Sequence, residues 1–402
     1  MQIYSQGWNV CYSGSNGLTR VFTLDWGNAY AVGYNGFMLR TTNGGLSWEE
    51  LSTNTTKDLY DVKFLDTQTG FICGSDGTLL KSIDGGNTWT QCTTNTTLHL
   101  KSICFIDDKI AFISGSDRPD PWPYVCGTGI ILKTVDGGQS FIPCMSLNAG
   151  IQRIAAYNKD TCLAICNGLY LGGPGNLILK TTNGGISWQT CIKCGINLTS
   201  IETFPSGSAY VCGYMEELFK TPDFGISWDS VGLHGGFSTD MSFPSPDTGY
   251  TVGYDLMAGG GMMWRSIDSG LTWNIEMGGD FFGIDLLNDS IGFTVKSDGT
   301  IYKRGLFDAI KNVVSLTEPV IVYPNPVYSY LNIEIQTNAS NLNNLYPNLI
   351  EIISIKGEKL REEYFFGKDY QMNDLQALSP GLYNLVLKNN SSIIYSGRFV
   401  KK

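Results

Sequence analysis

The chain has 402 residues, a formal net charge of -10 and only 16% charged residues, together with 48 glycines, 21 tyrosines, 19 phenylalanines and 9 tryptophans. Its acidity argues against non-specific binding to nucleic acid or to an anionic membrane, because both require a basic face. No apolar run is long enough to span a bilayer, and abundant glycine with many aromatic residues predicts an all-β protein of many short strands. The first seven residues, MQIYSQG, lack the charged start and apolar core of a signal peptide.

From residue 41 onward, one eight-residue motif recurs six times. Its copies are TTNGGLSW (41–48), SIDGGNTW (82–89), TVDGGQSF (134–141), TTNGGISW (181–188), TPDFGISW (221–228) and SIDSGLTW (266–273). The copies end 40 to 52 residues apart, and a period in the forties built from strand patterns is typical of a β-propeller blade. Within one period, LYDVKFL, FICGS, TLLKSI and TWTQC (59–92) read as four antiparallel strands, with Asp76-Gly77 suited to a tight hairpin.

Each copy of the motif is expected to close a turn. Its Asp or Asn is expected to accept hydrogen bonds from backbone N–H groups two residues ahead, its Gly supplies a positive φ, and its aromatic residue packs against the blade. These structural residues are Asn43, Gly45, Trp48, Asp84, Gly86, Trp89, Asp136, Gly138, Phe141, Asn183, Gly185, Trp188, Asp223, Gly225, Trp228, Asp268, Gly270 and Trp273.

A seventh repeat follows without the motif. FFGIDLL (281–287), IGFTVKS (291–297) and TIYKRG (300–305) supply three strands, and WNVCYSG (8–14) at the other end of the chain can supply the fourth. That pairing would close the ring and leave no open sheet edge. We therefore expect a seven-bladed propeller over residues 1–305 with blade 7 closed by the N-terminal strand, a linker over 306–319, and a small immunoglobulin-like β-sandwich over 320–402.

The motif resembles the Asp-box, or bacterial neuraminidase repeat, and the longer AVGYNGFMLRTTNGGLSW (31–48) is similar to the photosystem II stability/assembly factor family. This resemblance runs from Trp8 to about Gly305. It implies the propeller fold and says little about activity, because Asp-boxes recur in sialidases, xyloglucanases, sorting receptors and assembly factors. In such propellers the motif turns lie opposite the usual ligand face, so ligand groups are expected in the loops between second and third strands and in the links between blades.

Three blades carry enlarged loops between their second and third strands: DRPDPWPYVCG (117–127), NGLYLGGPGN (167–176) and DLMAGGGMMW (255–264). Topology places them on one face. The candidate ligand residues there are Asp117, Arg118, Asp120, Trp122, Tyr124, Tyr170, Asp255 and Met262. The alternative is that Pro- and Gly-rich loops merely vary in length.

A basic residue precedes nearly every motif, and we call this set the basic ring: Arg40, Lys81, Lys133, Lys180, Lys220, Arg265 and, in the seventh repeat, Lys303. In the assembly-factor family, Arg at this position forms a patch implicated in partner binding. Five of the seven are Lys, which lacks the bidentate fork of Arg. This difference weakens the inference that the basic ring binds a partner as the family's Arg patch does. The favoured interpretation is that each one is a cross-strand partner for the motif carboxylates.

No catalytic residue is singled out. A sialidase resemblance would require an Arg triad, an F/Y-R-I-P segment and a Tyr/Glu pair, and the sequence contains no such segment. His99 and His234 are the only histidines and no nucleophile elbow is present, which argues against a nucleophilic triad. Cys191 and Cys194 form a CxxC without a second pair at zinc spacing, so neither metal nor cofactor is expected.

The sequence pattern changes after Gly305. There, apolar and polar residues alternate as in β-strands, in VIVYPNPV, YLNIEI, LIEIISIKGEKL, LSPGLYNLVLKN and IYSGRFVKK. Their order closely resembles the type A C-terminal sorting domain of the type IX (Por) secretion system of Bacteroidetes. The matching residues are Tyr323, Pro324, Asn325, Pro326, Gly357, Gly381, Tyr383, Lys401 and Lys402. The resemblance implies export, and removal of the domain by a sortase-type protease that attaches the protein to the cell surface. A generic immunoglobulin-like module is the alternative.

The sequence thus predicts a secreted or cell-surface propeller, a monomer without catalytic activity, that recognises a protein or a glycan and has the type IX machinery and its sortase as partners. A divergent Asp-box glycoside hydrolase is the main alternative, and a purely structural adhesin component is a third. A pair of buried carboxylates with raised pKa values in the central cleft would favour the hydrolase. A shallow mouth lined by Trp122 and Tyr170 would favour the binding protein.

Overall fold

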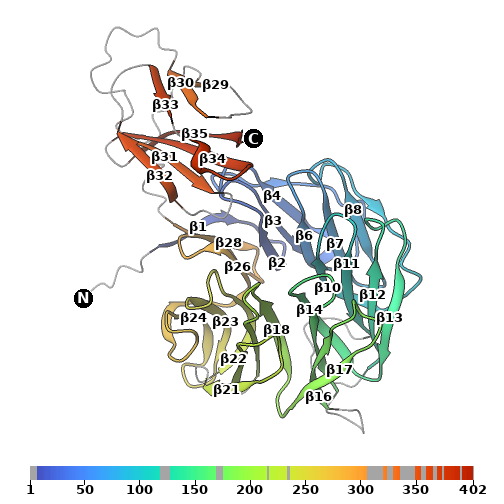
Figure 1. The fold of residues 1–402 in the computed structure, drawn as a ribbon. Helices are drawn as coiled ribbons and strands as arrows, with labels where there is room; N and C mark the ends of the chain where they lie inside the picture. Colours follow the sequence, from blue (N-terminus) through green and yellow to red (C-terminus); the bar gives the residue numbers. More distant parts are fainter. Residues whose placement is uncertain are drawn as a thin grey trace. The chain divides into compact units, whose positions relative to one another are not determined.

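A computed structural model of the chain describes residues 7–117, 127–168, 175–214, 217–232, 236–305, 320–323, 329–335, 349–354, 359–364, 369–373, 375–389 and 392–401. The chain divides into two compact units, Met1–Arg304 and Gly305–Lys402. The described part of the first unit consists of seven four-stranded antiparallel sheets, which confirms the predicted all-β propeller (Figure 1).

The blades follow one another along the chain. Their strands are β2 (Leu18–Thr23), β3 (Ala29–Gly33), β4 (Met38–Thr41) and β5 (Glu49–Glu50); β6 (Leu59–Phe64), β7 (Gly70–Gly74), β8 (Leu79–Ser82) and β9 (Thr90–Gln91); β10 (His99–Phe105), β11 (Ala111–Ser116), β12 (Gly129–Thr134) and β13 (Ile142–Leu147); β14 (Gly150–Ala156), β15 (Cys162–Asn167), β16 (Asn176–Thr181) and β17 (Gln189–Cys194); β18 (Leu198–Thr203), β19 (Ala209–Gly213), β20 (Glu217–Thr221) and β21 (Asp229–Gly232); β22 (Gly236–Ser242), β23 (Gly249–Asp255), β24 (Gly260–Ser266) and β25 (Asn274–Gly278); and β26 (Phe281–Asn288), β27 (Ile291–Lys296) and β28 (Thr300–Arg304).

The seventh sheet takes its outer strand from the start of the chain. β1 (Trp8–Ser13) pairs antiparallel with β28, with Trp8 opposite Arg304 and Ser13 opposite Thr300. The strand order in this sheet is β1-β28-β27-β26. Because blade 7 receives a strand from the far end of the sequence, the first and last repeats are held together by backbone hydrogen bonds.

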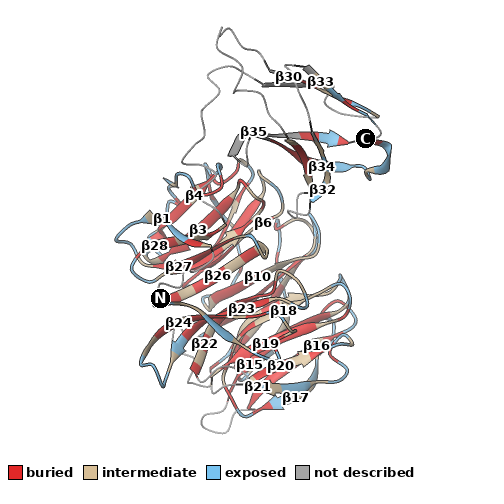
Figure 2. Cartoon of the chain, turned by 90° about the vertical axis from the view of Figure 1, so that its left-hand side faces the viewer, coloured by how far each residue is buried: buried red, intermediate tan, exposed pale blue. Residues whose placement is uncertain are grey.

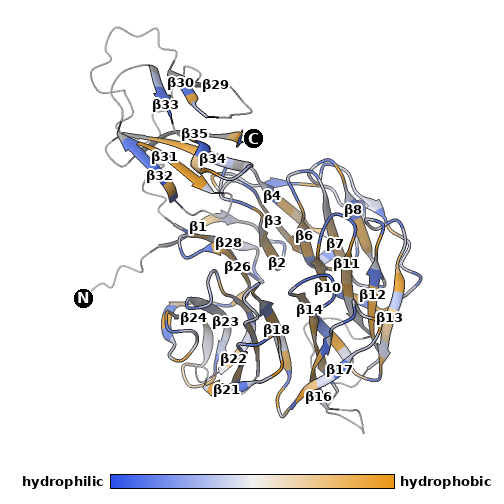
Figure 3. Ribbon diagram, viewed as in Figure 1, coloured by the Kyte–Doolittle hydropathy of each residue, from blue (hydrophilic) through white to orange (hydrophobic). Residues whose placement is uncertain are grey.

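Burial decreases from the inner strands to the outer strand of each blade (Figure 2). In blade 2 every residue of β7 is buried, whereas both residues of β9 are exposed. The middle strands are packed on both faces by neighbouring blades, so they read as continuous apolar runs such as AYAVG and GFICG, which Figure 3 shows as orange segments.

In blades 1 and 2 the turn between the second and third strands places two consecutive residues at positive φ. In blade 1 it forms the short 3-10 turn η1 (Tyr34–Gly36), in which Asn35 and Gly36 both have positive φ. Asp76 and Gly77 adopt the same conformation in blade 2. A Cβ on Gly36 would lie 1.9 Å from the carbonyl oxygen of Thr55, and one on Gly77 would lie 2.0 Å from that of Thr96. Glycine is therefore required where this turn contacts the link to the next blade.

The second unit contains two sheets, β29-β30-β33 and β32-β31-β34-β35. Its elements are β29 (Val320–Tyr323), β30 (Leu331–Ile335), β31 (Leu349–Ser354), β32 (Lys359–Tyr364), β33 (Asp369–Met372), the 3-10 turn η3 (Leu375–Ala377), β34 (Gly381–Asn389) and β35 (Ser392–Lys401). One apolar core includes Leu331 and Ile333 of the first sheet with Ile350, Leu385 and Phe399 of the second. Two sheets sharing one core form a small sandwich.

Candidate functional site

The Asp-box turns have one geometry in all six copies. In blade 2 the Asp84 carboxylate accepts hydrogen bonds from the backbone N–H of Thr88 (2.9 Å) and from its hydroxyl (2.6 Å), while Ser82 Oγ accepts the N–H of Gly86 (2.8 Å). These hydrogen bonds lower the pKa of Asp84, Asp223 and Asp268 to about 2 and lower that of Asp136 as well. The remaining two copies use Asn43 and Asn183 in the same way.

The prediction of which backbone N–H groups the motif carboxylate binds was wrong. The N–H groups that it binds lie three and four residues ahead, as at Gln139 and Ser140 for Asp136, and not two residues ahead. The reason is the pair of positive-φ residues that follows it, Gly137 (φ 69°) and Gly138 (φ 84°), which coils the turn around the carboxylate. The aromatic residues of the motif lie in the blade cores: Trp89 and Phe141 are buried, and Trp89 packs edge-on against Phe64.

The basic ring joins neighbouring blades. Arg40 Nη1 donates to the carbonyl of Gly85 (2.6 Å), Lys81 Nζ to that of Gly137 (2.6 Å) and Lys133 Nζ to that of Gly184 (2.7 Å). Each acceptor belongs to the Asp-box of the next blade. The expectation of a bond to the motif carboxylate was therefore wrong for these three residues, because the carboxylate is already saturated by its own turn.

The other members of the basic ring have different surroundings. Lys180 lines a small cavity beside Gly225, and Lys220 lies over the Tyr210 ring. Blade 7 has no Asp-box, and Arg265 of blade 6 instead pairs with Asp289 of blade 7 (2.6 Å). Lys303 reaches the first Asp-box, where a Cβ on Gly44 would lie 3.5 Å from its Nζ, and burial lowers its pKa.

The central channel is lined by the first strand of each blade. Every one of these strands has a register shift after its first residues, and such bulges re-aim the side chains that follow. We call the seven residues that directly follow the shift the arginine layer: Arg20, Asp61, Ser102, Arg153, Ser200, Asp240 and Gly283. Their charges are two positive and two negative, so they balance.

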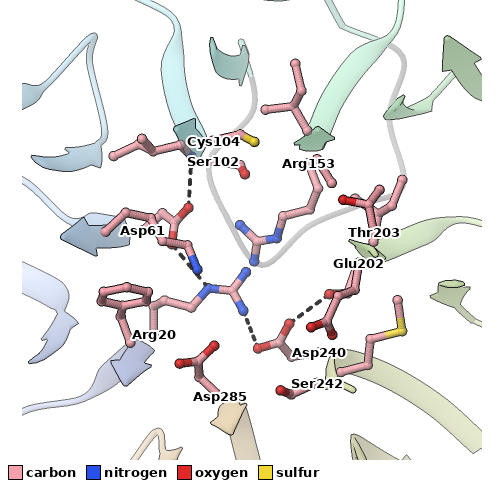
Figure 4. A pocket seen from close by; sticks show the side chains of 18 of the residues that line it. Arg20, Asp61, Ser102, Cys104, Arg153, Glu202, Thr203, Asp240, Ser242 and Asp285 are labelled. Atoms are coloured by element: carbon pink, nitrogen blue, oxygen red, sulfur yellow. Dashed lines mark hydrogen bonds and ion pairs between the residues drawn. The ribbon is translucent and has the colours of Figure 1, made fainter. Parts of the chain in front are cut away.

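Arg20 connects three blades within the arginine layer. Its guanidinium pairs with Asp240 of blade 6 and lies 3.7 Å from Asp61 of blade 2, as Figure 4 shows. The Arg20 side chain extends past blade 7. The residue of blade 7 in the arginine layer is Gly283, which has no side chain. Ser200 also donates to Asp240 (2.9 Å). Burial alone would lower the pKa of Arg20, but its two carboxylate partners outweigh burial and raise it.

The channel carboxylates also bind the backbone of the next blade. Asp61 accepts the N–H of Ile103 (2.9 Å) and Asp240 that of Ile284 (3.0 Å). Glu202 accepts the N–H of Phe243 (2.6 Å), and Asp285 accepts that of Thr23 (2.6 Å) across the point where the ring closes. These four bonds have the same form: each crosses from the first strand of one blade to the first strand of the next or, at Phe243, to the residue directly after it.

Two of these carboxyl groups have raised pKa values. Burial raises the pKa of Glu202 to about 8, and the pKa of Asp285 is also raised, mainly by burial. Burial acts on Asp240 too, but the charges of Arg20 and Arg153 outweigh it and hold the pKa of Asp240 below its usual value. At neutral pH Glu202 is therefore mostly protonated, while Asp240 is a carboxylate.

A cavity of about 340 Å³ lies beside the arginine layer and is also lined by Lys63, Cys104, Glu202, Ser242 and Asp285 (Figure 4). Its walls continue to Phe105, Ala156 and Thr203, at the ends of the first strands. The turns after these strands bind the Asp-boxes, as in the bond from Gly137 N–H to the Lys109 carbonyl (2.9 Å). The cavity is therefore on the Asp-box side of the arginine layer, away from the candidate ligand face.

Arg20, Arg153 and the other residues of this channel were not predicted from the sequence. A signal was present, because the arginine layer recurs with the repeat, and residues such as Asp61 in LYDVKF interrupt an otherwise apolar strand. A charge at that place in a buried strand needs a partner.

The candidate ligand face is described in part. Asp117 is exposed and its N–H donates to the Thr128 carbonyl (3.0 Å). Asp255 accepts the N–H groups of Met257 and Ala258 and so caps its own turn. Met262 is half-buried in β24. The expected ligand residues Arg118, Asp120, Trp122, Tyr124 and Tyr170 lie outside the described residues.

The sorting-motif residues are likewise described in part. Gly381 pairs with Lys401 across β34 and β35, and the Lys401 side chain is buried. The Tyr383 hydroxyl donates to the Ser379 carbonyl (2.6 Å), and its ring packs on Phe399 with a centroid distance of 5.7 Å. Tyr323 pairs with Asn332 through its backbone. Pro324, Asn325, Pro326, Gly357 and Lys402 lie outside the described residues.

The described residues contain no group of three or more His, Cys, Asp or Glu side chains placed to hold a metal ion. Cys92, Cys144 and Cys191 are half-buried thiols, and burial raises the pKa of each. In the described part of the chain, no helix is long and apolar enough to cross a membrane.

Comparison with known proteins supports both parts of the chain. Residues 45–147 match the family model for the photosynthesis system II assembly factor YCF48, and residues 321–402 match the secretion system C-terminal sorting domain. No curated protein matches the chain. Among solved structures, YCF48 from Cyanidioschyzon merolae is 18% identical with a TM-score of 0.59, and the match covers 74% of this chain and 99% of that one.

Two other similar structures differ in function. The GH74 enzyme of Niastella koreensis is 14% identical over 83% of this chain and 60% of its own, with a TM-score of 0.57. PorZ of Porphyromonas gingivalis, a surface component of the type-IX secretion system, is 13% identical over 98% of this chain and 61% of its own, with a TM-score of 0.52. At these identities the likeness shows the fold alone.

The sorting domain indicates export by type IX secretion, to the cell surface or beyond it. The chain therefore joins a propeller with YCF48-like repeats to a secretion system C-terminal sorting domain, as the two sequence resemblances predicted.

Proposed function

We propose that the chain is an exported propeller that binds a glycan or a protein without chemistry of its own. The observation that carries this proposal is the use of the channel carboxylates. Asp61, Glu202, Asp240 and Asp285 each accept a backbone N–H from the neighbouring blade, so they act as parts of the scaffold. The sorting domain supports a site of action outside the cell.

One observation favours the alternative, a glycoside hydrolase. Glu202 and Asp285 are two buried carboxyl groups with raised pKa values beside a cavity, which is the feature expected of that class. A protonated Glu202 would serve as the general acid and a second carboxylate as base or nucleophile. Against this, both groups also bind backbone N–H, and the cavity is on the Asp-box side of the channel.

The two functions separate in one experiment on the full chain. Purified protein is incubated with a panel of soluble polysaccharides and with extracellular proteins, and both binding and new reducing ends are measured. The binding function predicts retention of at least one ligand and no new reducing ends. New reducing ends formed by the wild type and lost in Glu202→Gln would contradict it and support the hydrolase.

A further inference from the structure

We propose that a neutral oligosaccharide binds in a polar groove of blade 1, on the face opposite the Asp-box turns. This inference rests on the proposed binding function and gives it a site and a ligand class. The groove has a volume of about 880 Å³. One wall is the η1 turn (Tyr34–Gly36), the other runs from the last residue of β5 into the link to β6 (50–56), and Asn16 completes the groove.

The groove is held open by hydrogen bonds between its walls. Thr53 Oγ1 donates to the carbonyl of Gly36 (2.7 Å), and Asp58 Oδ1 accepts the N–H of Asn35 (3.0 Å). Leu51 N–H donates to the carbonyl of Met38 (3.0 Å). Because these contacts exist without a ligand, little ordering would be needed on binding, which favours affinity.

Blade 2 provides an internal comparison for the same position. There the equivalent turn carries Asp76, and Lys57 pairs with it across 2.5 Å. In blade 1 these two positions are Asn35 and Asn16, as their places relative to Leu18 and Leu59 show. Both asparagines are exposed, and their side-chain amides make no hydrogen bond within the described part of the chain. The ion pair of blade 2 is thus replaced by two exposed amides in blade 1.

The chemistry of the lining favours a neutral polyol. The exposed side chains Asn16, Asn35, Ser52, Asn54 and Thr56 offer amide and hydroxyl groups, which both donate and accept hydrogen bonds as sugar hydroxyls require. Half-buried Tyr34 adds an aromatic surface.

The charge and the small exposed apolar area of the groove lining argue against an anionic ligand and against a protein. The described lining contains no Lys, Arg or His, and its one charged residue is Glu50, so an anionic ligand would have no partner and would be repelled. A protein would need a buried apolar anchor, whereas Phe37 is already buried and Leu51 is half-buried.

The inference is tested on the full chain with an array of neutral oligosaccharides, followed by titration calorimetry with the tightest binder. Two variants alter the groove. The double variant Asn16→Lys/Asn35→Asp places the blade 2 ion pair in it, and Asn54→Gly removes one amide at a position whose φ of 56° glycine adopts freely. Asn95→Gly is the matched control, because Asn95 has a φ of 54° in the same link of blade 2.

We expect both groove variants to weaken binding by about five- to tenfold, the effect of losing roughly one hydrogen bond, with the Asn95→Gly control within about twofold of the wild type. Binding that is unchanged in both groove variants would overturn the site and leave the binding function standing. A wild-type chain that binds no neutral oligosaccharide would overturn the inference, while its retention on a protein of the panel would still support the proposed function. Thermal melts confirm that the variants are folded.

Discussion

At the scale of single residues, the environment separates carboxyl groups of one chemical type. Asp84 at the surface accepts hydrogen bonds within its own turn, and its pKa falls to about 2. Glu202 in the channel is buried, and its pKa rises to about 8. The first group is charged at all ordinary pH values, whereas the second is mostly neutral at pH 7, so the two affect stability at opposite ends of the pH scale.

The Asp-box carboxylates predict a loss of stability in acid. Their pKa values are lowered by folding, so their contribution is present above a pH of about 4, their ordinary pKa, and is lost as the pH falls toward 2. Urea unfolding between pH 5 and pH 2 should show this decline. Asp84→Asn should show a weaker decline, because Asn43 and Asn183 already close the same turn in other blades. An identical decline in both proteins would contradict the role assigned to Asp84.

The raised pKa of Glu202 predicts the opposite dependence of stability on pH. Its pKa is raised by folding, so its contribution is complete below a pH of about 4.3 and is lost as the pH rises through about 8. Glu202→Gln keeps an oxygen for the Phe243 N–H and removes the titration. Its melting temperature relative to the wild type should therefore increase between pH 5 and pH 9, measured by calorimetry. A difference that does not change with pH would show that Glu202 is not buried as described.

At the scale of the strand and its turn, three members of the basic ring, Arg40, Lys81 and Lys133, link their blades to the next Asp-box. Lys81→Met should destabilise the fold by about 1–3 kcal/mol, because it leaves a partly buried carbonyl of Gly137 without its donor. Lys180→Met is the matched control, since within the described residues Lys180 makes no such bond, and it should cost about 0.5 kcal/mol or less. Chemical denaturation measures both, and equal losses would contradict the blade-linking role.

The repeats were predictable from sequence because their information is local. The Gly, Asp and Trp of each motif act within eight residues, so the turn, the hairpins and the period follow from short-range chemistry. The partners of the basic ring were not predictable in this way, since Lys81 and Gly137 belong to different blades. Asp240 lies 220 residues from Arg20, and only the closed ring brings them together.

At the scale of the whole propeller, the ring is stabilised at two radii. Arg40, Lys81, Lys133 and Arg265 of the basic ring join blades on the outside, and the channel carboxylates join them on the inside. The N-terminal strand closes the last blade, where Trp8 is buried and lies under the Arg304 guanidinium. Because the channel charges stabilise the scaffold, we expect recognition on the face opposite the Asp-box turns, where the Asn16–Asn35 groove lies.

Hydrogen exchange on the intact chain tests this claim most directly. We expect the amides of Thr23, Ile103, Phe243 and Ile284, which donate to the channel carboxylates, to exchange as slowly as the best-protected amides of the propeller, and β1 to be as protected as β28. Exchange of β1 and of these four amides within seconds, with the blades still protected, would mean that the ring is open and that the channel carboxylates are not part of the scaffold.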